Sequence, residues 1–262
     1  MPIVRPTPLR ALSQDEFRDL SFAVKGTVID IHREFGRLFD ERVYKLELAR
    51  RLPGVRLETP VDVTHRDFSK RYFLDVLVAD GGLFEFKAVD AFTPRHRAQL
   101  VHYLMLCDLE HAMLVATRAD RLVTEFVNTT FSTRERLRYR TDTARWDAGS
   151  AGAAKLAEIT NAMLADWGAG LDVGLYEEAL TNFLGGEPAV VRPVPVTTAG
   201  VRLIEQKVRL AAEGVAFKVT TFGEIPPSFE PHARHFLEHT DLVAIQWINI
   251  NPHCVTFTTI KA

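Results

Sequence analysis

The stretch that decides the fold is FLDVLVADGGLFEFKAVDAFTPRHRAQLVHY, residues 73–103. Residues 71–79 and 83–89 are rich in aliphatic, β-branched and aromatic side chains, as strands are. Gly81-Gly82 between them predicts a tight hairpin. A helix is expected to follow over residues 94–106. The stretch therefore predicts two antiparallel strands that lead into a helix.

Charged side chains of this stretch converge on one place. Side chains alternate along a strand, so Glu85 and Lys87 share a face, and Asp75 can join them from the paired strand. Two carboxylates this close repel each other unless a positive charge lies between them. Because hard divalent cations prefer oxygen ligands, the pattern predicts a metal site. On the helix that follows, Gln99 and Tyr103 are four residues apart and share a face.

The composition is ordinary for a globular protein. The 262 residues are 47% hydrophobic and 25% charged, which is enough for one large domain or two smaller ones. The cysteines, Cys107 and Cys254, are far apart in apolar surroundings, so neither a disulfide framework nor a cysteine zinc site is expected. No run has the length of a membrane span, and the N-terminus lacks a signal-peptide core. We therefore expect a soluble protein in a reducing cytoplasm.

Positive charge is concentrated in the first half of the chain. The net charge is −2, but Lys and Arg outnumber Asp and Glu before residue 146, and the remainder is acidic. Arg95 and Arg97 flank His96 beside the predicted site, and arginines alternate in TRERLRYR, residues 133–140. A planar guanidinium suits phosphate, so these residues favour phosphate binding. The alternative for such a charge run is a solvated surface.

Two helices are expected before the hairpin. A capping box at Ser13 predicts a helix that continues to about residue 35. A second helix is expected over about residues 40–52. On this helix Glu41 and Tyr44 are three residues apart and therefore share a face.

Further strands flank the hairpin. A strand is expected over residues 55–65, and Pro60 within it argues for an edge position. Two more strands, over residues 111–117 and 122–130, complete the first unit. Residues 141–152 are small and polar and predict a linker.

The second half repeats the first at an offset of about 132 residues. Residues 168–180, GAGLDVGLYEEAL, parallel residues 36–48, GRLFDERVYKLEL. Ala216-Phe217-Lys218 parallels Glu85-Phe86-Lys87, and HARHFLEHTDLVAI, residues 232–245, parallels the helix that carries Gln99 and the strand after it. A nearly constant offset over separate landmarks indicates duplication of a whole domain.

The second copy lacks the acids of the first. It keeps Tyr176 and Lys218. The replacements are Val173 for Glu41, Gln206 near Asp75, Ala216 for Glu85 and His232 for Gln99. Without carboxylates a divalent ion has no ligands, so the second copy is expected to be inert. The predicted domains are residues 1–146, with an intact motif, and residues 147–262, a degenerate repeat.

Four segments carry a resemblance to a known family. They are Gly36 with Glu41–Tyr44, Leu74–Val78, Phe84–Val89 and Arg95–Leu104. Together they resemble the GxxExxY family of the PD-(D/E)XK nuclease superfamily over about residues 24–130, and weakly over residues 167–260. The resemblance implies an α/β, restriction-endonuclease-like fold, a mixed sheet flanked by helices, present twice in tandem.

The resemblance also implies a metal site and its ligands. Mg²⁺ or Mn²⁺ would be held by Asp75, Glu85 and the carbonyl oxygen of Phe86. Glu41 would correspond to an accessory acid that ligates the metal directly or through water. Lys87 would position or deprotonate the attacking water. Because a lysine accepts a proton only if its pKa is depressed, this last role relies on the adjacent cation.

The helix after the hairpin is expected to contact the substrate. Gln99 and Tyr103 resemble the QxxxY element of RecB-type exonucleases, in which this helix borders the site. Arg95, His96 and Arg97 precede it and are the other substrate-binding candidates. We therefore interpret the chain as a metal-dependent nuclease that hydrolyses phosphodiester bonds of nucleic acid, with DNA favoured over RNA.

Two other interpretations of the same residues stay open. One is a non-catalytic nucleic-acid or protein-binding module on a nuclease-like scaffold, and the other is a metal-dependent phosphoesterase for a small substrate. Glu and Lys alternate on many exposed strands, but Glu85 lies in an otherwise apolar strand, where a carboxylate is costly unless paired. No membrane partner is expected, and a homo-oligomer is left open.

Overall fold

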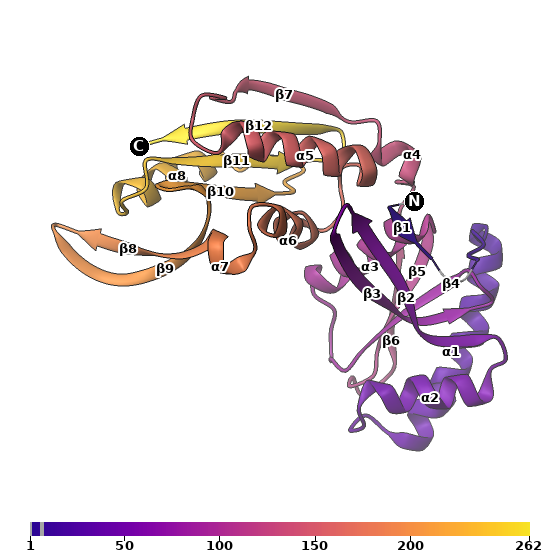
Figure 1. Cartoon of the computed structure of the whole chain (residues 1–262). Coiled ribbons are helices and arrows are strands. Elements are labelled where there is room, and N and C mark those ends of the chain that lie inside the picture. Colours follow the sequence, from indigo (N-terminus) through magenta and orange to yellow (C-terminus); the bar gives the residue numbers. More distant parts are fainter. Residues whose placement is uncertain (1, 6–7) are drawn as a thin grey trace. The chain divides into compact units, whose positions relative to one another are not determined.

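A computed structural model of the chain describes residues 2–5 and 8–262, and Figure 1 shows its helices and strands. Contacts divide the chain into unit 1, residues 1–133, and unit 2, residues 134–262. Within the described residues, each unit combines helices with a six-stranded sheet that holds parallel and antiparallel pairs. A mixed α/β fold, which fits a restriction-endonuclease-like architecture, is therefore confirmed.

Unit 1 has the predicted order of two helices, three strands, a helix and two strands, with a short strand before them. The elements are β1 (Ile3–Val4), α1 (Gln14–Phe35), α2 (Glu41–Arg51), β2 (Val55–His65), β3 (Phe68–Val78), β4 (Gly82–Lys87), α3 (Pro94–Cys107), β5 (His111–Ala116) and β6 (Val123–Asn128). The strands lie in the order β1-β2-β3-β4-β5-β6. Only β4 and β5 are parallel in this part of the structure, and α3 connects them.

Alternation along β4 separates a packed face from a charged face. Phe84 and Phe86 are fully buried among apolar side chains of α1 and α2, including Val28 and Tyr44. Glu85 therefore points to the opposite face, where its charge acts on a tyrosine of α3. The packing of the two phenylalanines against α1 and α2 thus fixes the direction of the charged side chains.

The predicted hairpin forms between β3 and β4, but its turn consists of Ala79, Asp80 and Gly81, while Gly82 is already the first residue of β4. Ala79 and Asp80 have φ angles of 50° and 59°, the left-handed conformation that matches the twist of paired strands. A Cβ atom on Gly81 would lie 2.1 Å from the carbonyl oxygen of Arg10. Glycine is therefore required here for the close approach of the N-terminal segment, and the predicted turn position is wrong.

The strand with the internal proline is not the last strand of its sheet, so the predicted edge position is wrong. β2 pairs with β3 over most of its length, and on its other side Asp62 and Val63 pair with Val4 and Ile3 of β1.

Unit 2 has the same order of two helices, three strands, a helix and two strands, with two short helices added and with its first strand at one end of the sheet in place of β1 at the other. The elements are α4 (Thr133–Arg136) at the junction, β7 (Arg140–Arg145), α5 (Ala153–Trp167), α6 (Val173–Phe183), α7 (Glu187–Val190), β8 (Val191–Thr198), β9 (Val201–Ala212), β10 (Val215–Thr220), α8 (Phe229–Glu238), β11 (Ala244–Ile250) and β12 (Cys254–Lys261). The strand order is β7-β12-β11-β10-β9-β8. As in unit 1, the two central strands joined by a helix, β10 and β11, are parallel.

Two expectations for the start of unit 2 are wrong. Residues 140–145, assigned in part to a linker, form β7 and pair with β12, so the predicted boundary at residue 146 falls after the first strand of unit 2. Arg136, one of the alternating arginines, is fully buried and donates to the carbonyl oxygen of Trp167 at 2.5 Å. This arginine is therefore a packing residue and not part of a phosphate-binding surface.

The two units share a detail that local sequence dictates. Gly36 and Gly168 follow α1 and α5 with φ of 71° and 73°, a conformation that favours glycine. The hydroxyl of Tyr44 donates to the carbonyl oxygen of Gly36, and that of Tyr176 donates to Gly168 at 2.6 Å. Each tyrosine is fully buried. Both tyrosines are therefore core residues that hold the glycine after each helix.

Two further features of the described residues are the state of the cysteines and the length of the helices. Cys107 is buried, Cys254 is half-buried, and both are free thiols. Among the residues that the structure describes, none of the helices combines the length and apolar character that crossing a bilayer requires.

We expect Tyr176→Phe to lower the free energy of unfolding of unit 2 by about 1–3 kcal/mol, because a buried carbonyl loses its donor. Tyr44→Phe should have an effect of the same size in unit 1. Amide hydrogen exchange in α6 and α2 reports each unit separately. A loss of protection below about 0.3 kcal/mol in both variants would contradict a structural role for the tyrosines.

Candidate active site

Asp75 lies where the pairing of β3 is interrupted on both sides. Toward β4 the paired residues end at Val76, and toward β2 the register skips Glu58 and Asp75. Glu58 has a left-handed φ of 49°. Irregular and strained backbone of this kind redirects side chains and is concentrated at functional sites. Asp75 therefore lies outside the regular pairing with both neighbouring strands, at the candidate site.

Both oxygens of the Asp75 carboxylate have partners. Oδ2 accepts a hydrogen bond from the backbone amide of Phe86 at 3.0 Å, and Oδ1 accepts one from Nζ of Lys45 at 2.9 Å. The carboxylate thus acts as acceptor for β4 where the regular ladder has ended. Asp75 is held firmly at the opening between the two strands.

Glu85 is the most buried acid of the site. Its exposed fraction is 2%, and Oε1 accepts a hydrogen bond from Nζ of Lys87 at 2.7 Å. Its second oxygen, Oε2, is buried and has no hydrogen-bond partner within the described residues. A buried carboxylate oxygen without a partner costs roughly 1–3 kcal/mol or more. Something other than the neighbouring side chains is needed to satisfy this oxygen.

The protonation of Glu85 reflects this environment. Burial and, to a smaller extent, the charge of Asp75 together raise the pKa of Glu85 to about 7, although Lys87 opposes both effects. At neutral pH the side chain is therefore divided between its acid and its carboxylate. A bound cation would favour the carboxylate, because an opposite charge nearby stabilises the ionised form.

Lys87 is an ammonium ion in this arrangement. Burial works against its charge, but Glu85, Asp75 and Glu41 more than offset that effect, so its pKa is raised. The side chain can donate hydrogen bonds but cannot accept a proton. Deprotonation of water by Lys87 would thus require a cation nearby, as the sequence-based interpretation assumed.

A second lysine, which the sequence analysis did not include, completes the site. Nζ of Lys45 lies 2.6 Å from Glu58 and 2.9 Å from Asp75, and the side chain is buried. Burial opposes its charge, but the hydrogen bonds to Glu58 and Asp75 raise its pKa. The available sequence signal was position: Lys45 follows Glu41 by four residues and so shares its helix face.

Glu41 lies close to the site but is held by a backbone group. It is the first residue of α2, where a negative charge is favourable, and its Oε2 accepts from the amide of Ala88 at 3.1 Å. Within residues 2–5 and 8–262, no three His, Cys, Asp or Glu side chains gather closely enough to hold a metal ion. Glu41 is therefore not gathered with Asp75 and Glu85 as a direct third ligand.

Helix α3 borders the site through the predicted pair. Nε2 of Gln99 donates to the hydroxyl of Tyr103 at 2.9 Å. Burial raises the pKa of Tyr103, a hydrogen bond from Gln99 opposes this, and the charge of Glu85 adds to it. The electrostatic interaction with Glu85 places the tyrosine beside the acids. The predicted proximity of this helix to the strand residues agrees with the structure.

The three residues at the start of α3 differ in what they can offer a ligand. Nδ1 of His96 accepts from the amide of Thr93 at 3.2 Å, which is a helix-capping contact. Arg97 makes a two-pronged ion pair with Glu125 at 2.5 and 2.7 Å. Arg95 is exposed and makes no side-chain hydrogen bond or ion pair within the described residues. Of the three, Arg95 is the side chain available to an incoming phosphate.

The donor set fits a divalent cation. The acids outnumber the ammonium groups by two when all are ionised, so a doubly charged ion would neutralise the site. The acids are Glu41, Glu58, Asp75 and Glu85, and the ammonium groups are those of Lys45 and Lys87. Magnesium is commonly held by one or two protein carboxylates together with water and substrate phosphate. The unpartnered oxygen of Glu85 meets that requirement.

Comparison with known proteins gives one result. Residues 18–127 match a family model described as PD-(D/E)XK nuclease superfamily. The match lies within unit 1 and contains all the residues of the candidate site, and it supports placing this unit in that superfamily. Members are generally nuclease hydrolases and typically use divalent metals. No curated protein and no solved structure matches the chain.

The raised pKa of Glu85 predicts a pH-dependent gain from Glu85→Gln. Because folding favours the protonated acid, wild-type stability is full below about pH 4.5 and falls as the pH rises through about 7. The variant should therefore exceed the wild type at pH 8, by an amount on the order of 3 kcal/mol, and much less at pH 5.

Urea unfolding at both pH values measures this difference. Glu213→Gln makes the same change at an exposed position and is the matched control. An equal difference between Glu85→Gln and wild type at pH 5 and pH 8 would contradict the raised pKa.

Proposed function

We propose that unit 1 is a divalent-metal-dependent nuclease that hydrolyses phosphodiester bonds of DNA. The observation that carries the proposal is the buried, unpartnered carboxylate oxygen of Glu85 beside Asp75 and Lys87, inside the segment that matches the nuclease superfamily. The ion pair with Lys87 uses only Oε1 and leaves Oε2 unsatisfied among the described residues. An oxygen donor of this kind suits a hard cation.

Asp75, Glu85 and the carbonyl oxygen of Phe86 would hold Mg²⁺ or Mn²⁺. Glu41, which faces Lys87 but is not gathered with the other acids, would act through water. When bound, the cation would supply a Lewis acid for a phosphoryl oxygen and lower the pKa of its water. The choice between Mg²⁺ and Mn²⁺ is not decided by an all-oxygen donor set.

The chain's own residues would stabilise and position the phosphate. The ammonium group of Lys87 can donate to a phosphate oxygen on which negative charge develops. Lys45 fixes the orientation of Asp75 and balances part of the acid charge. Arg95 and the Gln99–Tyr103 pair on α3 would guide the strand, a role like that of the corresponding helix in RecB-type exonucleases.

We also propose that the chain is an internally duplicated member of the GxxExxY type, with unit 2 a degenerate copy. The equal order of elements, the parallel central strands and the tyrosine-to-glycine hydrogen bonds of both units support this. Cleavage is accordingly assigned to unit 1 alone.

One observation favours a second candidate, a non-catalytic nucleic-acid or protein-binding module. Lys45 already supplies a positive charge to Asp75 at 2.9 Å, so part of the role of a cation is filled by the protein itself. Uptake of metal separates the two candidates, because a binding module has no need of it.

We expect purified protein with Mg²⁺ or Mn²⁺ to cleave DNA, and Glu85→Ala and Lys87→Ala each to lower the rate at least about 100-fold. Linear, circular and single-stranded DNA, with RNA of equal sequence, serve as substrates. Lys25→Ala removes an exposed lysine of unit 1 and should leave the rate unchanged. Cleavage that persists in both site variants would contradict the proposal.

Mn²⁺ affinity should rise between pH 6 and pH 8, because binding requires the ionised form of Glu85, whose pKa is about 7. Calorimetry near pH 7 in two buffers of different ionisation enthalpy should detect proton release on binding. Asp75→Ala should abolish uptake. Affinity that does not change with pH would argue against Glu85 as a ligand.

A further inference from the structure

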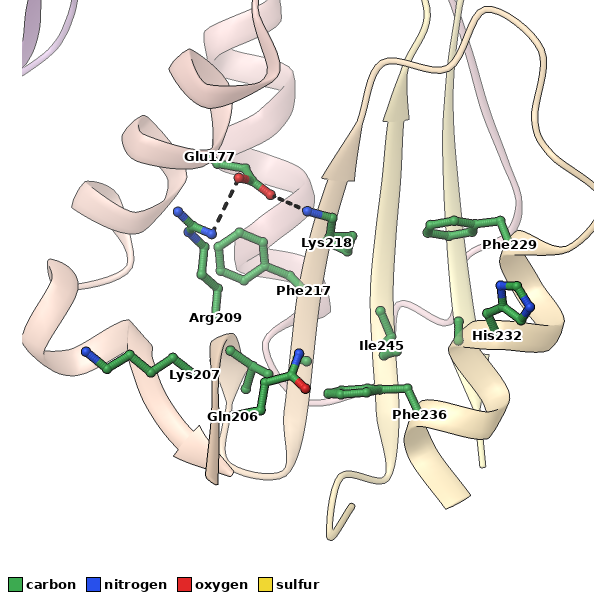
Figure 2. Close-up of a pocket in the computed structure, with 13 residues that line it drawn as sticks. Glu177, Gln206, Lys207, Arg209, Phe217, Lys218, Phe229, His232, Phe236 and Ile245 are labelled. Carbon is green, nitrogen blue, oxygen red and sulfur yellow. Dashed lines mark hydrogen bonds and ion pairs between the residues drawn. The ribbon is translucent and has the colours of Figure 1, made fainter. Parts of the chain in front are cut away.

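Unit 2 contains an open pocket of about 370 Å³ bounded by α6, β9, β10 and α8. Figure 2 shows Phe229 and Phe236 extending from α8 toward the strands, and Glu177 joining Arg209 and Lys218 on the opposite side. The pocket thus has an aromatic wall and a charged wall. Its volume is within the usual range for small-molecule sites.

The pocket occupies the place in unit 2 that the candidate active site occupies in unit 1. Ala216 of β10 pairs with Ile245 of β11, as Glu85 of β4 pairs with Leu114 of β5. Lys218 follows two residues later, on the same face as Ala216. The connecting helix α8 borders this pocket as α3 borders the site of unit 1.

The predicted replacements Gln206, Ala216 and His232 all line the pocket, but the strand register differs from that expected. His232 and Phe236 line the pocket four residues apart on α8, as Gln99 and Tyr103 are spaced on α3. Across the paired strand, however, Ala216 lies opposite Leu210, so Gln206 is not the register partner expected for Asp75. The cause is a shift of register between Val215 and Ala216, which no spacing in the sequence reveals.

The charge of the pocket is the reverse of that in unit 1. Glu177 lies four residues after Val173 on α6, as Lys45 lies four after Glu41 on α2, so an acid stands where unit 1 has a base. It contacts Nζ of Lys218 at 3.0 Å and Arg209 at 3.4 Å.

The cations around this single acid are in excess. Lys218 and Arg209 exceed Glu177 by one charge, and Lys207 adds another at the edge of the pocket. Unit 1 has an excess of acid at the same place. A divalent cation would be repelled here, whereas an anion would be attracted.

Glu177 also fixes the geometry of the two cations. Because both contact one carboxylate, Lys218 and Arg209 are held side by side, while Lys218 remains 52% exposed to a ligand. An ammonium ion and a guanidinium ion together are a common way to hold phosphate. The arrangement is therefore organised before any ligand enters.

The aromatic wall is suited to a planar ring. Phe229 and Phe236 are half-buried, so part of each ring faces the pocket. Phe229 is supported from behind by Trp247, with ring centroids 4.3 Å apart. Stacking on such rings stabilises nucleobases by roughly 1–3 kcal/mol per base, whatever the base.

We propose that this pocket binds a 5′-phosphorylated nucleotide, with the phosphate at Lys218 and Arg209 and the base against Phe229 and Phe236. The nucleotide can be free or can be the terminal residue of a DNA strand, since both present the same phosphate and ring. The proposal concerns unit 2 and does not depend on cleavage by unit 1. Unit 2 is then a nucleotide-binding partner of the first unit instead of an inert copy.

The test uses the full-length Glu85→Ala chain in EDTA, so that neither metal nor cleavage affects binding. The probes are dTMP, a thymidine hexanucleotide with a 5′-phosphate, and the same hexanucleotide with a 5′-hydroxyl. We expect both phosphorylated probes to bind, and the hydroxyl form to bind at least about fivefold more weakly than its phosphorylated counterpart. Tighter binding of dTMP would identify a free nucleotide as the ligand, and tighter binding of the phosphorylated strand would identify the end of a DNA strand.

Single substitutions assign the binding to the pocket. Lys218→Ala and Phe236→Leu should each weaken binding roughly fivefold or more, and the leucine keeps an apolar side chain in the wall so that folding is preserved. Lys155→Ala, an exposed position on α5, is the control and should have no effect.

Three results would overturn the proposal. They are failure of both phosphorylated probes to bind at millimolar concentration, affinity that Lys218→Ala leaves unchanged, and equal competition by an acidic peptide such as hexaglutamate. None of them bears on cleavage by unit 1, which is measured separately with metal present.

Discussion

The candidate site of unit 1 depends on the burial of the Glu85 carboxylate beside Asp75. Phe84 and Phe86 pack against α1 and α2, and this packing forces the residue between them to the other face of β4, under α3. Burial disfavours the carboxylate, and Asp75 disfavours it further. Lys87 offsets only part of this cost. The buried carboxylate therefore lowers the stability of the fold and has one oxygen without a partner in the part of the chain that the structure describes. A bound cation at this position would account for both features.

Local patterns predicted the parts of the fold that local physics controls. The helix cap at Ser13 and the alternation around Glu85 each depend on a few neighbouring residues, and both agree with the structure. The turn at Ala79 and the strand β7 were missed, because one depends on how the N-terminal segment packs and the other on pairing with a distant strand.

The sequence likewise predicted some residues of the candidate site and missed others. Asp75, Glu85 and Lys87 could be placed together from strand periodicity alone. Lys45 and Glu58 could not, because their contribution arises from an interruption of two strand ladders and from a long-range ion pair. The central elements follow the same order in both units, yet the charged groups differ: the candidate site of unit 1 has an excess of acids, and the pocket of unit 2 has an excess of basic groups. A shared order of elements therefore does not by itself determine the chemistry of a site.

The most direct test of the central claim is the titration of Glu85 itself. Carbon-13 NMR of the side-chain carboxyl, assigned with Glu85→Gln, measures its pKa with and without Mg²⁺. The account predicts a pKa of about 7 in the free protein and a marked decrease on addition of Mg²⁺. A pKa near the ordinary value for glutamate, or a raised pKa that Mg²⁺ does not lower, would contradict it.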